Sequence, residues 1–286
     1  MSFVQALVLA VLQGVSELFP VSSLGQTILI PALLHWDNIN RSDPKFLAFV
    51  VVLHLGTAFA LVAFYWKTWT RIVRALVASV IRGKVGDDPS EKLGWLLVVG
   101  TVPVGILGVL LKDPVRQFFG SARLAALFLM LNAGIMFFGE YLRRRQKRAA
   151  GRKDKPIEKL SWMQSVLIGL GQALALFPGI SRSGASMVAG LLADLDHEDA
   201  ANYSFLLATP VILAAGLLEI PELLAPGARV VLAQAVTGGI VAGIAAYASV
   251  AFLVRYFKNN DLRPFGWYCL VFGAFCFVLA SRGVIH

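Results

Sequence analysis

The chain has 286 residues, a formal net charge of +9 and 57% hydrophobic residues, and only 15% of its residues are charged. A water-soluble domain needs far less apolar sequence, and apolar runs of membrane-spanning length recur along the whole chain. The composition therefore excludes an ordinary soluble enzyme and predicts an all-α, polytopic integral membrane protein. No feature points to a nucleic-acid partner.

The chain begins with an apolar stretch that breaks before it can cross a membrane. Residues 3–20 contain Gln13 and Glu17, and residues 24–35 are too short to span about 30 Å of hydrocarbon at about 1.5 Å per residue. We expect 3–35 to form a re-entrant helix hairpin that returns to its own side. The N-terminal stretch lacks a basic region and a cleavage site, so we expect it to be retained.

Six further apolar runs are long enough to cross the bilayer. We expect them at 46–66, 92–111, 122–142, 204–222, 229–256 and 265–282. A second broken hairpin, 161–178 with 184–195, precedes the last three spans. Basic loops at 67–91 and 143–160 follow the first and third spans. The same plan, a hairpin followed by three spans, therefore occurs twice.

The two halves are predicted to be repeats. We expect a single membrane domain, 1–286, with internal repeats at about 1–142 and 161–286 joined by the basic loop 143–160. The turns SSLG and SRSG are 159 residues apart, and so are FLAFVVVLHLG and FLLATPVILAA, although a Leu- and Ala-rich chain also matches itself by chance. One hairpin and three crossings reverse the side of the membrane, which predicts inverted topology. In such folds the broken helices meet near the bilayer midplane.

The distribution of Lys and Arg predicts the orientation. Of 26 cations, 18 lie in or beside 67–92, 143–159 and 255–263, and seven lie in loops of the opposite face. The positive-inside rule makes the first face cytoplasmic and places both termini outside. The cations of 143–159 also attract anionic membrane lipids. The remaining cation, Arg182, lies inside the second hairpin.

Arg182 and Glu17 are charged residues at membrane depth, one in each hairpin. A charge there costs at least about 2.5 kcal/mol, so each needs a partner or a wet cavity. An ion pair that merely ties the halves together is one explanation. Ser181, Ser183 and Gly184 adjoin Arg182, and a guanidinium, hydroxyls and free N–H groups at the start of a half-helix suit a phosphate. An anion site is therefore the second explanation.

The first hairpin offers cation ligands and a nucleophile. Gln13 and Glu17 are four residues apart and share a helix face, and their oxygen atoms suit Mg²⁺ or Ca²⁺. Ser22 and Ser23 follow across the turn at Pro20, and each is either a hydroxyl nucleophile or a helix cap. A carboxylate and a hydroxyl opposite an Arg/Ser cradle predict a phosphoryl-transfer site.

Both hairpins resemble the signature motifs of a known family. QGVSELFPVSSLGQ, from Gln13 to Gln26, and PGISRSG, from Pro178 to Gly184, look like the two motifs of the undecaprenyl-diphosphatase, or bacitracin-resistance, family. The pattern of spans is similar over essentially the whole chain. The resemblance implies six transmembrane helices plus two re-entrant hairpins in the bacterial cell membrane. It also implies release of the terminal phosphate from undecaprenyl diphosphate for peptidoglycan synthesis, a requirement for Mg²⁺ or Ca²⁺, and a site that opens on the outer side.

The resemblance further implies roles for individual residues. Gln13 and Glu17 would hold the metal, with Glu17 also catalytic, Ser23 would be the nucleophile, and Arg182 would clamp the phosphate. The remaining substrate-binding residues would be Ser22, Gln26, Ser181, Ser183 and Gly184.

One position departs from the family pattern. Many members have a His three residues after the second serine, whereas this chain has Gln26, which cannot act as a general base. His54 is a lone ionisable residue in the first span, and a buried, neutral imidazole can accept a proton. His54 is therefore our catalytic candidate for that role. The alternatives are Glu17 as the base and His54 as a packing residue.

Two other classes of membrane protein share features with this chain. A prenyl-phosphate transporter or flippase shares the inverted-repeat architecture, whereas an acid-phosphatase-like enzyme needs a His where this chain has Val188. Cys269 and Cys276 are expected to pack rather than bind metal. Asp196 and Asp199 are expected to cap a helix. The sequence leaves open whether the protein is a homodimer and which polyprenyl diphosphate chain length it prefers.

Overall fold

The computed structural model describes residues 1–36, 38–39, 43–116, 118–150, 153–218 and 232–285. Every regular element in these residues is helical. Six of the described helices are long and apolar enough to cross a membrane. The prediction of an all-α polytopic membrane protein is therefore confirmed.

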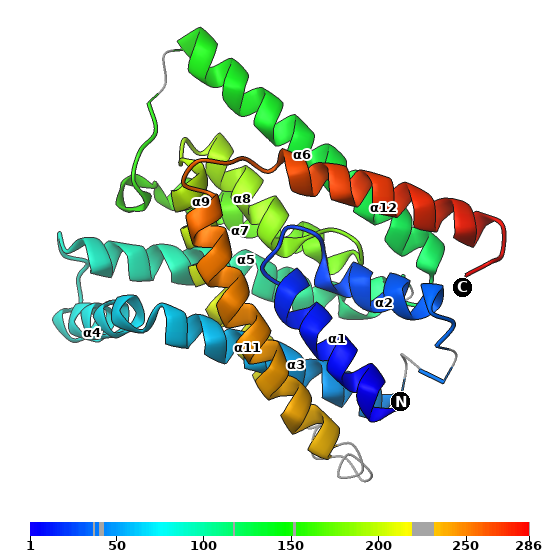
Figure 1. Ribbon diagram of the computed structural model, residues 1–286. Helices are drawn as coiled ribbons and strands as arrows, with labels where there is room; N and C mark the ends of the chain where they lie inside the picture. The colour runs from blue at the N-terminus through cyan, green and yellow to red at the C-terminus, as the bar shows by residue number, and fades with distance from the viewer. Residues whose placement is uncertain (37, 40–42, 117, 151–152, 219–231, 286) are drawn as a thin grey trace.

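Each half of the chain contributes two short helices followed by longer ones (Figure 1). The first half contains α1 (Phe3–Ser16), α2 (Ser23–Leu33), α3 (Pro44–Phe64), α4 (Trp66–Arg82), α5 (Pro89–Arg116) and α6 (Ala122–Ala150). The second half contains a 3-10 turn (Ile157–Lys159), α7 (Trp162–Ala173) with a second 3-10 turn (Leu174–Leu176), α8 (Arg182–Leu192), α9 (His197–Leu218), α11 (Leu232–Tyr256) and α12 (Arg263–Ser281). The short pairs α1–α2 and α7–α8 lie where the hairpins were predicted.

Several predicted boundaries were wrong. The segment 67–91, predicted as a basic loop, contains most of α4, and the first part of the predicted loop 143–160 is helical because α6 continues to Ala150. Charged residues interrupt the apolar pattern in both places, so a search for spans ends there although the helix does not. The predicted ends of spans 204–222 and 229–256 that fall within 219–231 lie outside the described residues.

Helix caps account for most of the observed starts. α9 begins seven residues before its predicted span because Asp196 Oδ1 accepts a hydrogen bond from Asp199 N at 2.7 Å, which confirms the predicted cap. α1 and α7 begin with the same capping box, Ser2 with Gln5 and Ser161 with Gln164. These two boxes are 159 residues apart, the spacing that also separates the turns SSLG and SRSG.

The two halves pack against each other along much of their length. The most extensive helix pairs, α3–α11, α6–α12, α1–α11 and α5–α7, all join one half to the other. A Cβ atom added at Gly14 of α1 would overlap the carbonyl oxygen of Ala242, and one at Gly56 of α3 would overlap that of Gly239. Small residues at these crossings let both helices approach α11 closely. This close packing fixes the end of α1 and the middle of α3 relative to each other.

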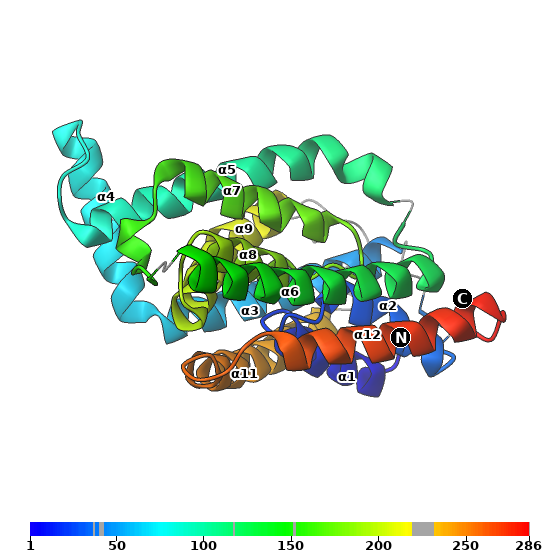
Figure 2. The same cartoon turned by 90° about the horizontal axis from the view of Figure 1, so that it is seen from above.

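The molecule has two distinct ends (Figures 1 and 2). Both chain termini lie at the right-hand end in each view, and α4 projects at the opposite end. An even number of crossings returns the chain to the side on which it began, which agrees with six spanning helices. The turns of the two short helix pairs lie between these ends.

Candidate functional site

The turns of the two hairpins are in direct contact. Gly179 N, in the α7–α8 turn, donates a hydrogen bond to Ser22 Oγ, in the α1–α2 turn, at 3.1 Å. Ser183 Oγ donates to Phe19 O at 3.3 Å. Sequence segments more than 150 residues apart therefore form one structure, as the predicted meeting of the broken helices requires.

Unusual backbone conformations shape both turns. Ser22 has φ 64°, a left-handed value that costs a non-glycine residue about 1–3 kcal/mol. Its Oγ accepts hydrogen bonds from Gly25 N and Gly179 N, so the strained residue satisfies two backbone donors that lack helical partners. Gly179 has φ 115°, and a Cβ atom there would overlap Ala125 O. Ser22 therefore serves the structure of the turns as well as any role toward substrate.

Glu17 lies at the centre of the site and binds the second hairpin through one carboxylate oxygen. Its Oε1 accepts hydrogen bonds from Arg182 Nη2 at 3.2 Å and Arg182 Nε at 3.4 Å. The two side chains are only 7% and 11% exposed. Glu17 and Arg182 therefore form the ion pair that was one of the two explanations offered for these charges, and this pair links the two halves of the chain.

The other carboxylate oxygen of Glu17 gathers residues of the first half. Ser23 Oγ donates to Oε2 at 2.6 Å, and Gln13 Nε2 donates to it at 3.0 Å. His54 Nε2 lies 3.5 Å from the same oxygen. A hydroxyl, an imidazole and a guanidinium therefore all converge on one buried carboxylate.

The cradle predicted around Arg182 forms the start of α8. Ser181 is the N-cap, and its Oγ accepts from Gly184 N at 3.1 Å. Ser183 Oγ lies 3.0 Å from Ser181 Oγ, so the two hydroxyls are neighbours. Hydroxyls, a guanidinium and the N-terminus of a helix thus lie together, and this combination suits an anion.

The donors around Glu17 are compatible with a hard divalent cation. Gln13 Oε1 is buried and has no hydrogen-bond partner among the described residues. With the Glu17 carboxylate it provides two kinds of oxygen ligand. No group of three His, Cys, Asp or Glu side chains suited to a metal occurs in the part of the chain that the structure describes. Two oxygen atoms are fewer than a closed metal site offers, and Mg²⁺ is a hard cation that takes few protein ligands.

Gln26 points away from the carboxylate, whereas His54 points toward it. Gln26 Nε2 donates to Val21 O at 3.0 Å, and its Oε1 accepts from Tyr268 Oη at 3.2 Å. His54 Nδ1 lies 2.9 Å from Val50 O, which leaves Nε2 as the nitrogen that faces Glu17. Both polar groups of Gln26 are therefore held by the protein, and the imidazole beside the site belongs to α3.

Asn132 is a site residue that the sequence reasoning missed. It is fully buried on α6, its Nδ2 donates to Pro20 O at 3.0 Å, and its Oδ1 accepts from Ser181 N at 3.0 Å. One amide thus fastens the turn of each hairpin to the same spanning helix. The signal was present in the sequence, because Asn132 is a polar residue in the middle of the apolar run 124–138.

We predict that Asn132→Leu lowers both stability and turnover. The change leaves Ser181 N buried without its partner and leaves Pro20 O with only the thiol of Cys269, at 3.7 Å. An orphaned buried group costs about 1–3 kcal/mol. A lower unfolding temperature in detergent, with slower phosphate release from a prenyl diphosphate, is the expected result. Leu131→Ala, at a neighbouring and 50% exposed position on α6, is the matched control and is expected to change neither. Normal stability and turnover of Asn132→Leu would contradict this role.

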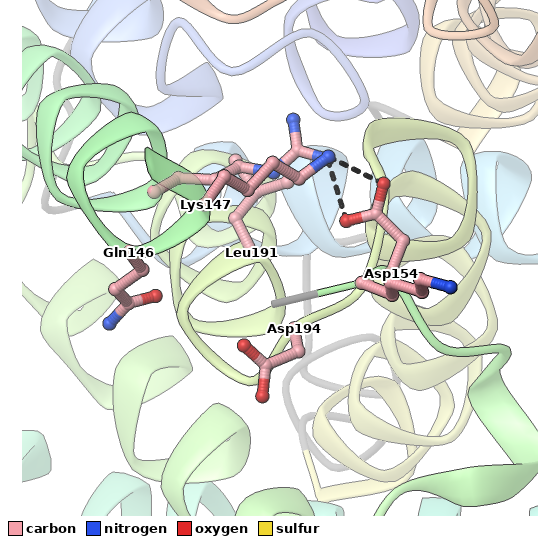
Figure 3. Close-up of a pocket in the computed structure, with 7 residues that line it drawn as sticks. Gln146, Lys147, Asp154, Leu191 and Asp194 are labelled. Atoms are coloured by element: carbon pink, nitrogen blue, oxygen red, sulfur yellow. Dashed lines mark hydrogen bonds and ion pairs between the residues drawn. The ribbon is translucent and has the colours of Figure 1, made fainter. Parts of the chain in front are cut away.

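A second polar feature lies near the loop after α6 and is separate from Glu17 (Figure 3). Its small, open pocket is lined by Arg143, Gln146, Lys147, Lys153, Asp154, Leu191 and Asp194. Asp154 accepts from Lys147 Nζ at 2.6 Å and from Arg143 at 3.3 Å. Burial alone would raise the pKa of Asp154, but these two cations outweigh it and lower the pKa. The pocket is therefore an ion-paired junction between α6 and the following loop.

Comparison with known proteins shows relatives over nearly the whole chain. The family model described as bacitracin resistance protein BacA matches residues 6–275. A protein of Acidiphilium cryptum named undecaprenyl-diphosphatase is 46% identical, with 97% of this chain and 98% of that protein covered. Proteins of Chromobacterium violaceum (undecaprenyl-diphosphatase 2; 47% identical, 96% and 97% covered) and Mycobacterium avium (undecaprenyl-diphosphatase; 44% identical, 96% and 95% covered) are similarly close.

The matched residues 6–275 include the turns of both hairpins and the residues Glu17, His54 and Arg182. Identity above 40% over this length exceeds what a shared architecture alone would give, and it agrees with the motif resemblance noted from the sequence. The chain belongs to the bacitracin resistance protein BacA family.

Proposed function

We propose that the protein is an undecaprenyl-diphosphatase, which hydrolyses undecaprenyl diphosphate to undecaprenyl phosphate and inorganic phosphate and so recycles the lipid carrier of peptidoglycan synthesis. The main structural support is the position of Glu17. This residue of the first hairpin is hydrogen-bonded to Ser23 at 2.6 Å and to Arg182 of the second hairpin at 3.2 Å. A nucleophile, a carboxylate and an anion-binding cation in one buried site are the groups that phosphoryl transfer needs. The names of the relatives support the same activity.

Arg182 is the group that would bind the terminal phosphate. Its guanidinium is held by Glu17 Oε1 in the free protein, and its Nη1 makes only a long contact, 3.5 Å, with Ser204 O. Guanidinium N–H groups that are weakly engaged remain able to contact phosphate oxygens. Ser181, Ser183 and the N-terminus of α8 would supply further donors. Ser22 and Gly184 lie at the same two turns and would shape the cradle, Ser22 through its side-chain oxygen and Gly184 through its backbone N–H.

A divalent cation, Mg²⁺ or Ca²⁺, would balance the remaining charge. Glu17 and Arg182 form a neutral pair, whereas a diphosphate brings several negative charges into a buried site, and buried charge without compensation is costly. Gln13 Oε1, which is buried and unpartnered among the described residues, and the Glu17 carboxylate are the oxygens that would hold the ion. The bound ion would supply charge neutralisation of the phosphate oxygens.

Ser23 is the proposed nucleophile. Attack of its Oγ on the terminal phosphorus would form a phosphoserine and break the bond to the bridging oxygen, which leaves as undecaprenyl phosphate. Water would then cleave the phosphoserine and release inorganic phosphate. In the free protein the hydroxyl proton already points to Glu17 Oε2, so this carboxylate is the first acceptor in reach.

His54 would share with Glu17 the proton that leaves the Ser23 hydroxyl. Its Nε2 lies 3.5 Å from the oxygen that accepts from Ser23, and its Nδ1 is oriented by Val50 O. An imidazole placed beside a carboxylate can hold the proton as an ion pair until it passes to the leaving oxygen. His54 would thus supply the imidazole that many family members have at the position of Gln26.

We predict that His54→Ala lowers kcat by about 10²-fold or more, the usual contribution of a positioned acid–base group. Gln26→His is expected to leave the wild-type rate nearly unchanged, because the side chain at 26 is held by Val21 O and Tyr268 rather than directed at Glu17. Steady-state phosphate release by both variants checks the prediction. Unaffected turnover in His54→Ala would remove His54 from the mechanism and leave Glu17 as the base.

The orientation of the chain is part of the proposal. The end that bears 18 of the 26 cations would face the cytoplasm, both termini would lie outside, and the site would open to the outer side of the cell membrane. Labelling of cysteines introduced at the two ends of the molecule with an impermeant maleimide, in intact cells, tests this directly.

The activity itself is tested by measuring inorganic phosphate released from a long-chain prenyl diphosphate by the purified protein in detergent. We expect release that a chelator abolishes and that Mg²⁺ or Ca²⁺ restores. Mass spectrometry of the lipid should show the monophosphate in equal amount. A folded protein that releases no phosphate but moves prenyl phosphate across a vesicle membrane would contradict the proposal and favour a lipid transporter.

A further inference from the structure

The amphipathic helix α4 (Trp66–Arg82) is attached to the protein along only one of its three faces. Ile72, Ala75 and Ser79 recur every three or four residues and are buried against α5. Trp95 Nε1 of α5 donates to Ser79 Oγ at 3.0 Å. The rotation of the helix about its own axis is therefore fixed, and so is the direction in which each of its other faces points.

The second face of α4 is an exposed apolar stripe. Its members are Trp66 (61% exposed), Val73 (52%), Val77 (53%), Val80 (66%) and Ile81 (80%). These positions share one face of the helix, on which Thr70, between Trp66 and Val73, is the one polar residue. An exposed apolar strip of this kind is costly to leave in water and marks an interaction surface.

The third face of α4 is basic. Lys67, Arg71 and Arg74 are exposed and form no ion pair in the described part of the chain. Arg82, at the end of the helix, pairs with Glu91. Lys67 and Arg74 directly follow Trp66 and Val73 in the sequence, so each cation is turned by about 100° around the axis from its apolar neighbour. The basic and apolar stripes therefore run side by side.

The place of α4 in the molecule restricts what can cover it. α4 follows α3 after a bend at Tyr65 and lies at the end of the molecule opposite the termini (Figures 1 and 2). Tyr65 Oη donates to Asn202 Oδ1 of α9 at 2.6 Å, which fastens the bend to a second spanning helix. A helix that leaves a span at a fixed bend remains close to the membrane surface.

We propose that α4 lies in the membrane–water interface and binds the anionic lipid headgroups of the adjacent leaflet, which the positive-inside rule makes the cytoplasmic one. If α4 lay in water, its apolar stripe would remain exposed; if it lay in the hydrocarbon core, its unpaired cations would be buried. The interface satisfies both, with the apolar stripe among acyl chains and the guanidinium and ammonium groups among phosphates.

A second copy of the chain is the other occupant that an apolar stripe could accept. A symmetric contact through this stripe would bring two basic stripes together, because they lie on neighbouring faces of the same helix. Like charges at close range oppose such a contact. The charge pattern therefore favours lipid over a second α4.

The test uses spin labels on the full chain in phosphatidylcholine vesicles with and without one quarter phosphatidylglycerol. Val77→Cys and Ala78→Cys form a matched pair, because they are adjacent, remove no charge and face the apolar and basic sides. Cys269 and Cys276 are fully buried and free, so native labelling addresses the introduced cysteine. Collision rates with oxygen and with a water-soluble nickel chelate are measured for each label, and phosphate release serves as a control for folding.

We expect the Val77 label to collide mainly with oxygen and the Ala78 label mainly with the chelate. Adding phosphatidylglycerol should raise the ratio of oxygen to chelate collisions for the Val77 label. The double substitution Arg71→Gln with Arg74→Gln should remove this increase without changing turnover. Equal chelate access for both labels would overturn the proposal, as would spin–spin broadening at Val77 that reveals a second copy. No response to phosphatidylglycerol would overturn recognition of anionic headgroups.

Discussion

Replacing Arg182 by Ala is expected to lower kcat/KM for a prenyl diphosphate by about 10³-fold or more, the loss typical of removing an arginine from a phosphoryl-transfer site. Arg182 Nη2 lies 3.2 Å from Glu17 Oε1, and the Arg182 side chain is 11% exposed. Arg182 is also the first residue of α8, the helix that carries Ser183. Removing it takes away the cation that would clamp the phosphate. It also leaves Glu17 buried without its partner, which costs about 3–5 kcal/mol.

Arg182→Lys separates the charge from the shape of the guanidinium. Lysine keeps a positive charge but cannot offer two parallel donors, so we expect a loss smaller than that of Arg182→Ala. Phosphate release by both variants is measured beside their unfolding temperatures. Arg123→Ala is the matched control, because Arg123 is exposed and its guanidinium lies over the ring of Phe277 at 5.4 Å rather than beside Glu17. Near wild-type release by a folded Arg182→Ala protein would contradict the assigned role.

Replacing Glu17 by Gln is expected to lower kcat by about 10²- to 10⁴-fold. The amide keeps the size of the side chain but removes the charge that accepts the Ser23 proton at 2.6 Å and that pairs with Arg182. If Glu17 also holds the divalent cation, the concentration of Mg²⁺ or Ca²⁺ needed for half-maximal activity rises as well. The measurement is phosphate release as a function of cation concentration.

Glu198→Gln is the control for Glu17→Gln. Glu198 is 37% exposed and lies 3.6 Å from Lys258, in the first turn of α9 rather than in a hairpin turn. Its neutralisation is expected to change neither the rate nor the cation requirement. Equal rates for Glu17→Gln and Glu198→Gln would show that the central carboxylate is structural only.

Much of the site could be predicted from the sequence because membrane depth makes polar residues conspicuous. Glu17 and Arg182 are charged residues inside apolar hairpins, so each had to find a partner or a ligand. The Ser- and Gly-rich turns interrupt short apolar helices, so their backbone groups needed partners as well. The structure brings both charges and both turns together at hydrogen-bonding distance.

What the sequence reasoning missed are features that apolar periodicity does not reveal. α4 mixes cations with apolar residues on neighbouring faces, so it does not form the long apolar run that identifies a span. Asn132 and Tyr268 reach the site from α6 and α12, and only the packing of these helices shows which way their side chains point. The side chain of Gln26, which the motif resemblance assigns to substrate binding, is hydrogen-bonded to Val21 O and Tyr268 in the free protein.

The most direct test of a single site built by both hairpins is a double-mutant cycle. Phosphate release is measured for the wild type, Glu17→Gln, Arg182→Lys and the double variant, each checked for folding. Because the two residues touch, we predict that the double variant is about as slow as the slower single variant. If the fold-loss in the double variant equalled the product of the two single losses, Glu17 and Arg182 would act independently. That result would contradict a single site built by both hairpins.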